Sequence, residues 1–426
     1  MKIMVIGGGG REHAIIKKLK QSSEVDIIYA LPGNGGIAQD AVCVDISAKD
    51  IHTIVGFARS NSIDFAVIAP DDPLVLGCVD ELEKAGIPCF GPNKNAAIIE
   101  GSKVFSKNLM KKYGIPTASY GVFTDISAAL RYLDTAPIPT VIKADGLALG
   151  KGVIIAMTRD EAKDAVRSMM EDKVFGESGL TVVIEEFLEG PEVSVLSFTD
   201  GKTVVPMVSS MDHKRAHDKD EGLNTGGMGT IAPNPYYTEE IAAECMEKIY
   251  IPTMNAMNAE GRTFKGCLYF GLMLTSHGPK VIEYNCRFGD PETQVVLPLL
   301  ESDLVDIMFA ARNETLADTE VKFSNGAACC VIMASDGYPE KYDKGFEITL
   351  PSPEPEGTEI FVAGAKLENG KLLTNGGRVL GVTATADDLK SAIDKAYGAV
   401  KHVHFENAFY RTDIGQKALK AFEKEV

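Results

Sequence analysis

The sequence lacks the features of a disulfide scaffold, a cysteine-based metal site or a membrane protein. Its eight cysteines include no C-x-x-C spacing, and the adjacent pair Cys329 and Cys330 lies in an apolar run where core filling is expected. No apolar run approaches the ~18 residues of a membrane-spanning helix. No signal-peptide pattern precedes the first expected strand. We therefore expect a cytoplasmic protein that does not bind membranes.

Positive charge is also scarce. The chain has 43 Lys and Arg against 60 Asp and Glu, a formal net charge of −17. Such a charge balance disfavours nucleic acids and anionic membrane surfaces as partners. An anionic small molecule would have to bind where Lys, Arg or backbone N–H groups gather locally. We expect small-molecule substrates, no nucleic acid, and a monomeric protein.

The length of 426 residues predicts two or three domains. Strand patterns at 2–6, 25–30 and 65–69 alternate with helical patterns, and each strand ends in a Gly, Pro or Asp cluster. This order predicts a doubly wound parallel sheet that binds ligands at the carboxyl ends of its strands. Strands and glycine loops follow from 140 to 198, and the segment 209–235 is expected to be a long functional loop.

Two glycine loops suggest anion binding without matching a nucleotide-binding motif. Gly7 to Gly10 lies between a strand and a helix, but the third glycine of a dinucleotide fingerprint is replaced by Glu12. A sugar phosphate at the helix start is the better interpretation, with a merely tight turn as the alternative. The segment 146–152 is not a Walker A motif. Its glycines and Lys151, with Lys143 on the preceding strand, predict a mobile cover over a triphosphate, unless it is a solvated hairpin.

A strand pattern at 281–286 places Glu283, Asn285 and Arg287 in a row. A carboxylate with an amide oxygen suits Mg²⁺, which takes few protein oxygens and keeps other positions for phosphate and water. The alternative is a strand edge with solvated polar residues. His213 and His217 have the spacing of a metal pair, but no third ligand lies nearby in the sequence, so we expect no zinc site.

Several runs together resemble the ATP-grasp enzymes, and most closely the phosphoribosylamine–glycine ligase family. The resemblance extends almost from end to end. The most specific runs are Asp212-His213-Lys214-Arg215, Asn224-Thr225-Gly226-Gly227-Met228-Gly229 and Asn285-Cys286-Arg287-Phe288-Gly289-Asp290-Pro291-Glu292-Thr293-Gln294, and others are Gly9-Gly10-Arg11-Glu12-His13-Ala14, Pro32-Gly33-Asn34 and Asn375-Gly376-Gly377-Arg378. The chain departs from the family pattern at Gly8, where Asn is common, and at Asp71-Asp72, where Glu-Ala is usual.

The resemblance implies an α/β fold of three parts: an N-terminal doubly wound parallel-sheet domain (1–100), a central ATP-grasp domain (101–320, with a lid subdomain at 118–190) and a C-terminal α+β domain (321–426). It implies ligation of glycine to 5-phosphoribosylamine, driven by ATP through glycyl phosphate, in purine biosynthesis. The alternative is another ATP-grasp carboxylate–amine ligase or a carboxylase. A nucleotide-sensing module with a degenerate site is less expected, because the lysines, Glu283 and Asn285 are all present.

The resemblance also implies roles for individual residues. ATP would be bound by Lys103, Lys143, Gly150, Lys151, Gly152, Glu185, Glu186, Phe187, Leu188 and Glu192, and Mg²⁺ or Mn²⁺ by Glu283 and Asn285. The substrates would be bound by Gly9, Gly10, Gly33, Asn34, Asp212, Gly226, Gly227, Met228, Arg287, Asp290, Pro291 and Glu292. Arg287, Asp212 and Lys143 would be catalytic.

Overall fold

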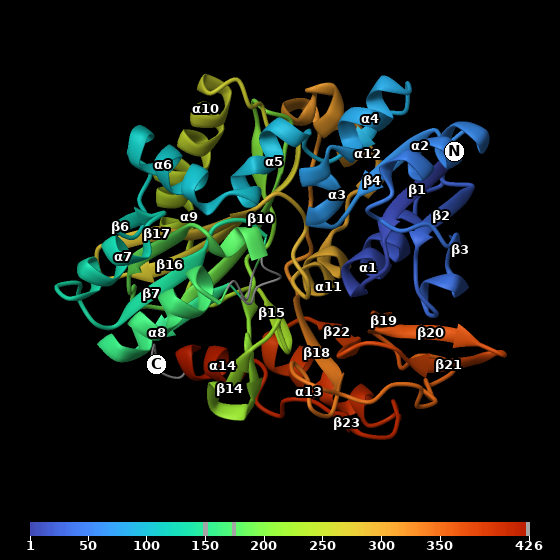
Figure 1. The fold of residues 1–426 in the computed structure, drawn as a ribbon. Coiled ribbons are helices and arrows are strands. Elements are labelled where there is room, and N and C mark those ends of the chain that lie inside the picture. Colours follow the sequence, from blue (N-terminus) through green and yellow to red (C-terminus); the bar gives the residue numbers. More distant parts are fainter. Residues whose placement is uncertain (148–151, 173–175, 423–426) are drawn as a thin grey trace.

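The computed structural model describes residues 1–147, 152–172 and 176–422, and Figure 1 shows its arrangement. The N-terminal part has five parallel strands in the order β3-β2-β1-β4-β5. These are β1 (Lys2–Gly7), β2 (Ile27–Pro32), β3 (Val42–Cys43), β4 (Phe65–Ile68) and β5 (Cys89–Phe90). The connecting helices are α1 (Gly10–Leu19), α2 (Ile51–Ser60), α3 (Asp71–Leu76), α4 (Cys78–Lys84) and α5 (Lys94–Gly101). The predicted doubly wound parallel sheet is confirmed, and its strand order reverses beside β1, where such sheets bind ligands.

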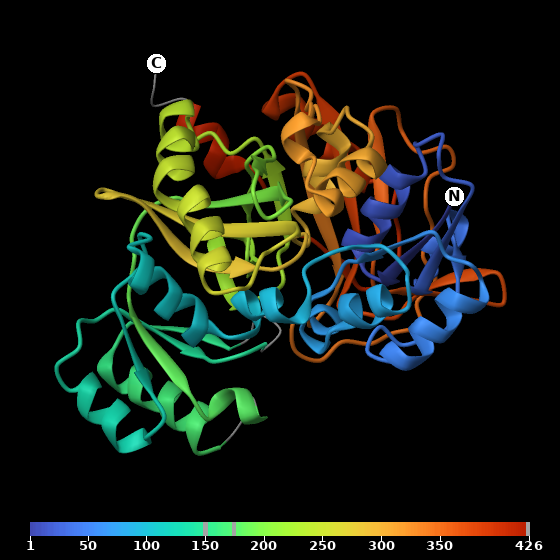
Figure 2. The same ribbon diagram turned by 90° about the horizontal axis from the view of Figure 1, so that it is seen from above.

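A second unit follows α6 (Lys103–Tyr113) and projects from the rest of the molecule (Figure 2). Its antiparallel sheet has the order β6-β9-β7-β8. The strands are β6 (Tyr120–Phe123), β7 (Thr140–Ala144), β8 (Val153–Ala156) and β9 (Val182–Glu186), and the helices are α7 (Ile126–Leu133) and α8 (Arg159–Met170). The unit has its own small apolar core, centred on Leu133, Ile142 and Met169. The unit is therefore a separately packed subdomain.

The central sheet is antiparallel, in the order β11-β10-β16-β17. Its strands are β10 (Glu192–Thr199), β11 (Val204–Pro206), β16 (Gly266–Thr275) and β17 (Gly278–Asn285), and the helices nearby are α9 (Glu239–Cys245), α10 (Ile251–Ala259), α11 (Thr293–Val296) and α12 (Leu304–Asn313). The apolar residues of this sheet share two hydrophobic cores with the N-terminal part. One core contains Val195 and Phe270 together with Ile6 and Leu74. The other contains Phe198 together with Val67. The two parts are thus packed as one body.

The C-terminal sheet has the order β12-β15-β18-β22-β19, with β23 paired to β18. The strands are β12 (Met211–Asp212), β15 (Gly229–Ala232), β18 (Ala327–Ser335), β19 (Thr358–Val362), β22 (Arg378–Ala386) and β23 (Ala408–Phe409). This part also contains two hairpins and two helices. The hairpins are β13 (Arg215–His217) with β14 (Glu221–Asn224), and β20 (Ala365–Glu368) with β21 (Lys371–Thr374). The helices are α13 (Leu389–Val400) and α14 (Gln416–Phe422). Within the described residues, no helix is both long and apolar enough to cross a bilayer.

The expectation of a structureless loop at 209–235 was wrong. This segment contains four short strands, and two of them, β12 and β15, extend the C-terminal sheet next to β18. Each of the four is two to four residues long, so no period-two pattern marks them in the sequence. β13 and β14 pair with each other, and β12 pairs with β15, but β15 also pairs with β18 about 100 positions away, as Thr230 does opposite Cys330.

Candidate active site

Two oxygen-bearing side chains lie together on β17, the last strand of the central sheet. Glu283 is paired with Gly271 of β16, and Asn285 with Tyr269. Residues two apart on a strand project from the same face, so the expected common face of Glu283 and Asn285 is confirmed. The expectation that Arg287 continues this row was wrong, because the strand ends at Asn285 and Arg287 lies beyond it.

Four cations influence the Glu283 carboxylate. They come from separate segments: Lys103 at the start of α6, Lys143 in β7, Lys214 ahead of β13, and Arg287. Burial raises the pKa of Glu283, but the combined field of these cations holds it below its ordinary value. These four side chains form a local cluster of positive charge in a chain of net charge −17, although three of them, Lys143, Lys214 and Arg287, also pair with carboxylates. The cluster suits a polyanion such as a triphosphate.

Lys143 is held in a buried group of two cations and one carboxylate. The Glu185 carboxylate lies 2.8 Å from Lys107 Nζ and 3.1 Å from Lys143 Nζ, and all three side chains are at most 5% exposed. Lys143 Nζ also donates to the carbonyl of Ile282, 3.1 Å away, which ties β7 of the projecting unit to β17 of the central sheet. Lys107 was not expected here, and burial lowers its pKa to about 8.

The start of α6 is fixed to the residues that precede the second glycine loop. Ser102 caps the helix through its hydroxyl, and the Asp145 carboxylate accepts bonds from Ser102 Oγ and the Val104 N–H, both at 3.1 Å. Lys103 Nζ donates to the carbonyl of Gly146 at 2.8 Å. The predicted ligands Gly150 and Lys151 lie outside the described residues, and Gly152 is buried beside β8.

The segment expected to bind adenine is the connection between β9 and β10. The side chain of Glu185 is used by the two lysines, and Glu186 accepts bonds from the N–H and hydroxyl of Ser119. In the part of the chain that the structure describes, the backbone N–H of Leu188 has no hydrogen-bond partner. A strand end with an unpaired backbone donor is suited to an adenine edge. At the start of β10, Glu192 forms an ion pair with Lys214.

Arg287 is anchored by a residue that the role assignments from sequence omitted. The Glu100 carboxylate lies 3.1 Å from Arg287 Nη2 and accepts the N–H of Cys286 at 2.7 Å. Burial raises the pKa of Glu100. Burial lowers the pKa of Arg287, but Glu100 and Asp71 together raise it above the ordinary value, so the guanidinium stays charged. Its Nε is buried without a partner among the described residues.

Two carboxyl groups at the other end of the cation cluster influence one another. Asp212 ends β12, and Glu292 lies just before α11. Burial first, and then the neighbouring Glu292, raise the pKa of Asp212 well above its ordinary value. Burial likewise raises the pKa of Glu292, which accepts a hydrogen bond from Ser194 Oγ at 3.2 Å. Each of these two carboxyl groups therefore keeps its proton to a higher pH than an exposed carboxyl group does.

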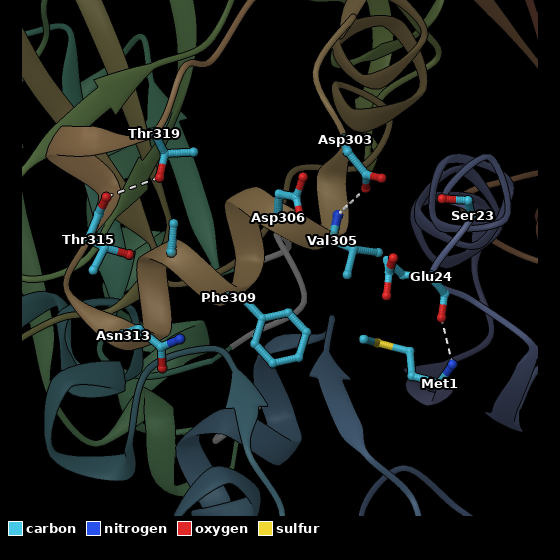
Figure 3. A pocket seen from close by; sticks show the side chains of 11 residues that line it. Met1, Ser23, Glu24, Asp303, Val305, Asp306, Phe309, Asn313, Thr315 and Thr319 are labelled. Atoms are coloured by element: carbon cyan, nitrogen blue, oxygen red, sulfur yellow. Dashed lines mark hydrogen bonds between the residues drawn. The ribbon is translucent and has the colours of Figure 1, made fainter.

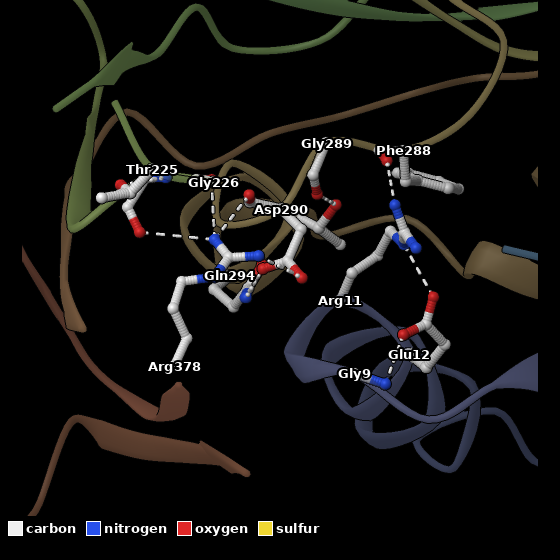
Figure 4. Close-up of polar contacts among 12 residues, drawn as sticks. Gly9, Arg11, Glu12, Thr225, Gly226, Phe288, Gly289, Asp290, Gln294 and Arg378 are labelled. Atoms are coloured by element: carbon white, nitrogen blue, oxygen red, sulfur yellow. Dashed lines mark hydrogen bonds and ion pairs between the residues drawn. The ribbon is translucent and has the colours of Figure 1, made fainter. Parts of the chain in front are cut away.

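Asp290 lies where the N-terminal, central and C-terminal parts of the chain meet (Figure 4). Arg378 of β22 pairs with the Asp290 carboxylate at 3.1 Å, and its Nη1 donates to the carbonyls of Gly226 at 2.7 Å and Asp290 at 2.9 Å. Gln294 donates to Asp290 Oδ1 at 2.7 Å. From the N-terminal part, Arg11 donates to the carbonyl of Phe288 at 3.1 Å.

Arg11 and Arg378 were therefore missed as candidate site residues. The available signal was that each directly follows a glycine pair within one of the runs that carry the resemblance, Gly9-Gly10-Arg11 and Gly376-Gly377-Arg378. Of the expected substrate ligands, Gly227 lies close to both Asp212 and Pro291. A Cβ atom added to Gly227 would be 2.5 Å from Asp212 Oδ1 and 2.5 Å from Pro291 Cδ, so only glycine fits there. Met228 is buried, and its N–H donates to the His213 carbonyl at 2.8 Å.

The loops expected to bind a sugar phosphate use part of their polar groups internally. The Gly9 N–H donates to the Glu12 carboxylate at 2.6 Å. Asn34 donates to the carbonyls of Gly8 and Val362 and accepts the N–H groups of Gly36 and Ile37, which satisfies its whole amide. Asn34 thus connects the N-terminal part to the C-terminal part by hydrogen bonds. At the first residue of α1, the backbone N–H group of Gly10 has no partner among the described residues.

A pocket elsewhere lies between the N-terminus and α12 (Figure 3). It is lined by the carboxylates Glu24, Asp303 and Asp306 and contains none of the expected site residues. Its acidic lining disfavours a phosphate ligand. The Glu283 region remains the candidate active site.

The donor set at Glu283 and Asn285 fits a divalent cation that is bound together with phosphate. Among the described residues, no group of three or more His, Cys, Asp or Glu side chains could hold a metal by itself. One carboxylate and one amide oxygen suit Mg²⁺, which keeps several positions for phosphate and water. The Glu283 carboxylate has no hydrogen bond or ion pair at contact distance within the described part of the chain, so it is available as a ligand.

The two antiparallel sheets that meet at the Lys143–Ile282 contact, with the cation cluster beside them, define an enzyme of the ATP-grasp class. A family model described as "Phosphoribosylglycinamide synthetase, ATP-grasp (A) domain" matches residues 101–293, and those of the N and C domains match 1–100 and 328–417. The chain belongs to the phosphoribosylglycinamide synthetase family.

Relatives support this membership over the full length. A phosphoribosylamine–glycine ligase from Caldanaerobacter subterraneus subsp. tengcongensis is 48% identical, with 97% of this chain and 99% of the relative covered. The crystal structure of a phosphoribosylamine–glycine ligase from Thermotoga maritima has a TM-score of 0.86 at 34% identity, covering 97% of this chain and all of the other. A biotin carboxylase from Campylobacter jejuni, 14% identical, has a TM-score of 0.75 over 96% of this chain and 92% of its own, and shares the fold alone.

Proposed function

We propose that the protein joins the carboxylate of glycine to the amine of 5-phosphoribosylamine, with ATP converted to ADP and phosphate. The observation that carries the proposal is the set of four cations around Glu283 and Asn285, next to the carboxyl pair Asp212 and Glu292. A carboxylate acylates an amine poorly because oxide would have to leave. Transfer of the γ-phosphoryl group to a glycine oxygen gives glycyl phosphate, and phosphate then leaves when the amine attacks the acyl carbon.

The protein's contribution is positioning and charge stabilisation. Lys103 and Lys143 bind the phosphates of ATP, the backbone near Leu188 binds adenine, and Glu192 binds the ribose. Arg287, held by Glu100, stabilises the charge that develops on the transferred group. A divalent cation bound by Glu283 and Asn285, Mg²⁺ or Mn²⁺, would neutralise part of the phosphate charge.

The other two substrates bind near the carboxyl pair Asp212 and Glu292 and near Asp290, where the N-terminal, central and C-terminal parts meet. Asp212 binds the ammonium group of glycine, and a carboxylate of raised pKa in the pair is a suitable acceptor for the proton that the attacking amine releases. The sugar phosphate binds at the start of α1, where Arg11 and the N–H groups from Gly10 onward supply positive charge. The sides of this site are formed by Gly33, Asn34, Gly226, Gly227 and Asp290.

A direct test is ADP formation with ATP, Mg²⁺, glycine and phosphoribosylamine, each omitted in turn. We expect ADP only when all four are present. Bicarbonate in place of glycine tests the carboxylase alternative, and ADP formation that depends on bicarbonate would contradict the proposal. We also propose that the enzyme is a cytoplasmic monomer; sedimentation velocity measures its oligomeric state.

A further inference from the structure

Among the residues that the structure describes, Arg411 has the largest side chain that is almost fully buried, at 1% exposure. It lies between β23 and α14 in the C-terminal part. Its Nε and Nη2 donate to the two carboxylate oxygens of Asp413, at 2.8 and 2.9 Å. Its Nη1 donates to the carbonyl of Arg215 at 3.1 Å and pairs with Asp220 at 2.9 Å. A planar guanidinium can make this forked set of bonds in several directions, and an ammonium cannot.

Further bonds join the same two segments. The N–H of Thr412 donates to the Asp218 carboxylate, and the N–H of Lys219 donates to the Asp413 carboxylate, both at 2.8 Å. Residues 411–415, which we call the clamp segment, thus hold the β13–β14 hairpin through backbone and side-chain groups. Sequence separation between the two segments is about 200 residues, so no local pattern reveals the contact.

His213 connects the clamp segment to the strand on the other side of the hairpin. Its Nε2 accepts the N–H of Gly415 at 3.2 Å, and its Nδ1 lies 3.1 Å from the carbonyl of Gly229. Because Nε2 accepts a hydrogen bond, the ring proton is on Nδ1, which donates to Gly229. Burial, together with the nearby Arg411, lowers the pKa of His213 to about 4, so the neutral ring that this geometry requires is present at pH 7.

The neighbours of His213 belong to the candidate active site. Asp212 interacts with Glu292, and Lys214 pairs with Glu192 and influences Glu283. Side chains alternate along an extended segment, so His213 contacts the clamp segment while Asp212 and Lys214 face the cation cluster. The carbonyl of Arg215, one residue further, is the one that Arg411 binds.

We propose that Arg411 and His213 are positioning residues for the amino-acid substrate: the clamp segment fixes the backbone of 212–215 and thereby sets the position of Asp212. This inference rests on the proposed role of Asp212 in binding glycine. Neither residue touches substrate. Misplacing Asp212 weakens glycine binding, whereas the phosphate-binding lysines Lys103 and Lys143 lie on α6 and β7 and keep their places.

The test compares Arg411→Met and His213→Phe with the parent enzyme, measuring KM for glycine, KM for ATP and kcat. We expect the KM for glycine to rise on the order of 10- to 100-fold in both variants, the scale for misplacing a binding group, with the KM for ATP unchanged. Arg411→Lys keeps the charge but not the fork, and we expect an intermediate value. Lys417→Ala is the matched control, because its ion pair with Asp220 belongs to the same cluster but the lysine is 63% exposed.

Equal changes in both KM values, or glycine KM values like that of the parent, would overturn the inference, because a merely structural defect does not select one substrate. Arg411→Lys and His213→Phe decide the matter if Arg411→Met does not fold. Amide hydrogen exchange provides a readout that needs no ligase activity. Faster exchange in 211–217 with unchanged exchange in 281–294 supports the clamp even if the parent enzyme proves not to use glycine, and unchanged exchange in 211–217 rejects it.

Discussion

Replacing Glu185 by glutamine should destabilise the fold strongly, although the two side chains are nearly the same size. In the native protein one carboxylate serves two ammonium groups, Lys107 at 2.8 Å and Lys143 at 3.1 Å, in a place where no side chain is more than 5% exposed. Glutamine keeps the volume and removes the charge. Two buried cations then face each other without a counter-ion, a situation that costs about 3–5 kcal/mol when a buried pair is broken.

Titration of Lys107 limits this cost. Burial lowers its pKa from 10.5 to about 8 even with Glu185 present, which corresponds to about 3 kcal/mol of lost stability at neutral pH. Without Glu185 the pKa falls further and the amine becomes neutral, and at pH 7 a neutral Lys107 costs about 5 kcal/mol relative to the unfolded chain. Lys107 therefore adds only about 1–2 kcal/mol to the loss, and Lys143 accounts for the rest. We expect a total of about 3 kcal/mol.

The pH dependence follows from the same group. A lysine whose folded pKa is depressed binds fewer protons in the folded than in the unfolded state, so the free energy of unfolding rises with pH between the folded and unfolded pKa values. For the parent this window is from about 8 to 10.5. In the variant it begins at a lower pH. The deficit of the variant should therefore narrow by about 1 kcal/mol between pH 7 and pH 9.

Urea unfolding at pH 7 and pH 9 measures both effects. Glu186→Gln is the matched control, since Glu186 is the next residue, is 42% exposed and has its lysine partner at 3.7 Å. We expect this control to lie within about 1 kcal/mol of the parent. If Glu185→Gln is no less stable than Glu186→Gln, or if its deficit widens at pH 9, the account of a shared buried carboxylate is refuted.

Two further predictions concern catalysis and the sugar-phosphate site. Glu283→Gln should retain the fold but lower turnover by about 100-fold or more, because it removes the only charged oxygen proposed to hold the metal; near-native turnover at ordinary Mg²⁺ concentration would reject that assignment. Gly10→Val should raise the KM for phosphoribosylamine while leaving the affinity for ATP intact, since a Cβ at Gly10 would lie 2.7 Å from Gln294 Nε2, which holds Asp290. Calorimetry showing that ATP affinity falls instead would assign nucleotide binding to the N-terminal part.

Much of the fold and the centre of the site could be predicted from local pattern. Short runs that are apolar at nearly every position, such as 2–6 and 65–69, became β1 and β4 because a strand buried on both faces needs apolar side chains throughout its buried part. The spacing of Glu283 and Asn285 placed them on one face because the strand period is two. Both inferences depend only on neighbours in the chain.

Other features were decided by tertiary structure alone. The short strand β15, and β12 beside it, extend the C-terminal sheet because β18 pairs with β15 from about 100 residues away, and their own sequences carry no strand period. Glu100 is next to Arg287, and Arg411 next to Arg215, only through folding. The Asn34 amide serves Val362 of the C-terminal part, a partner that the Pro-Gly-Asn run does not reveal. A sequence pattern shows which face of an element a side chain occupies, but the distance between two elements, and hence the partner of a charged group, is set by long-range packing.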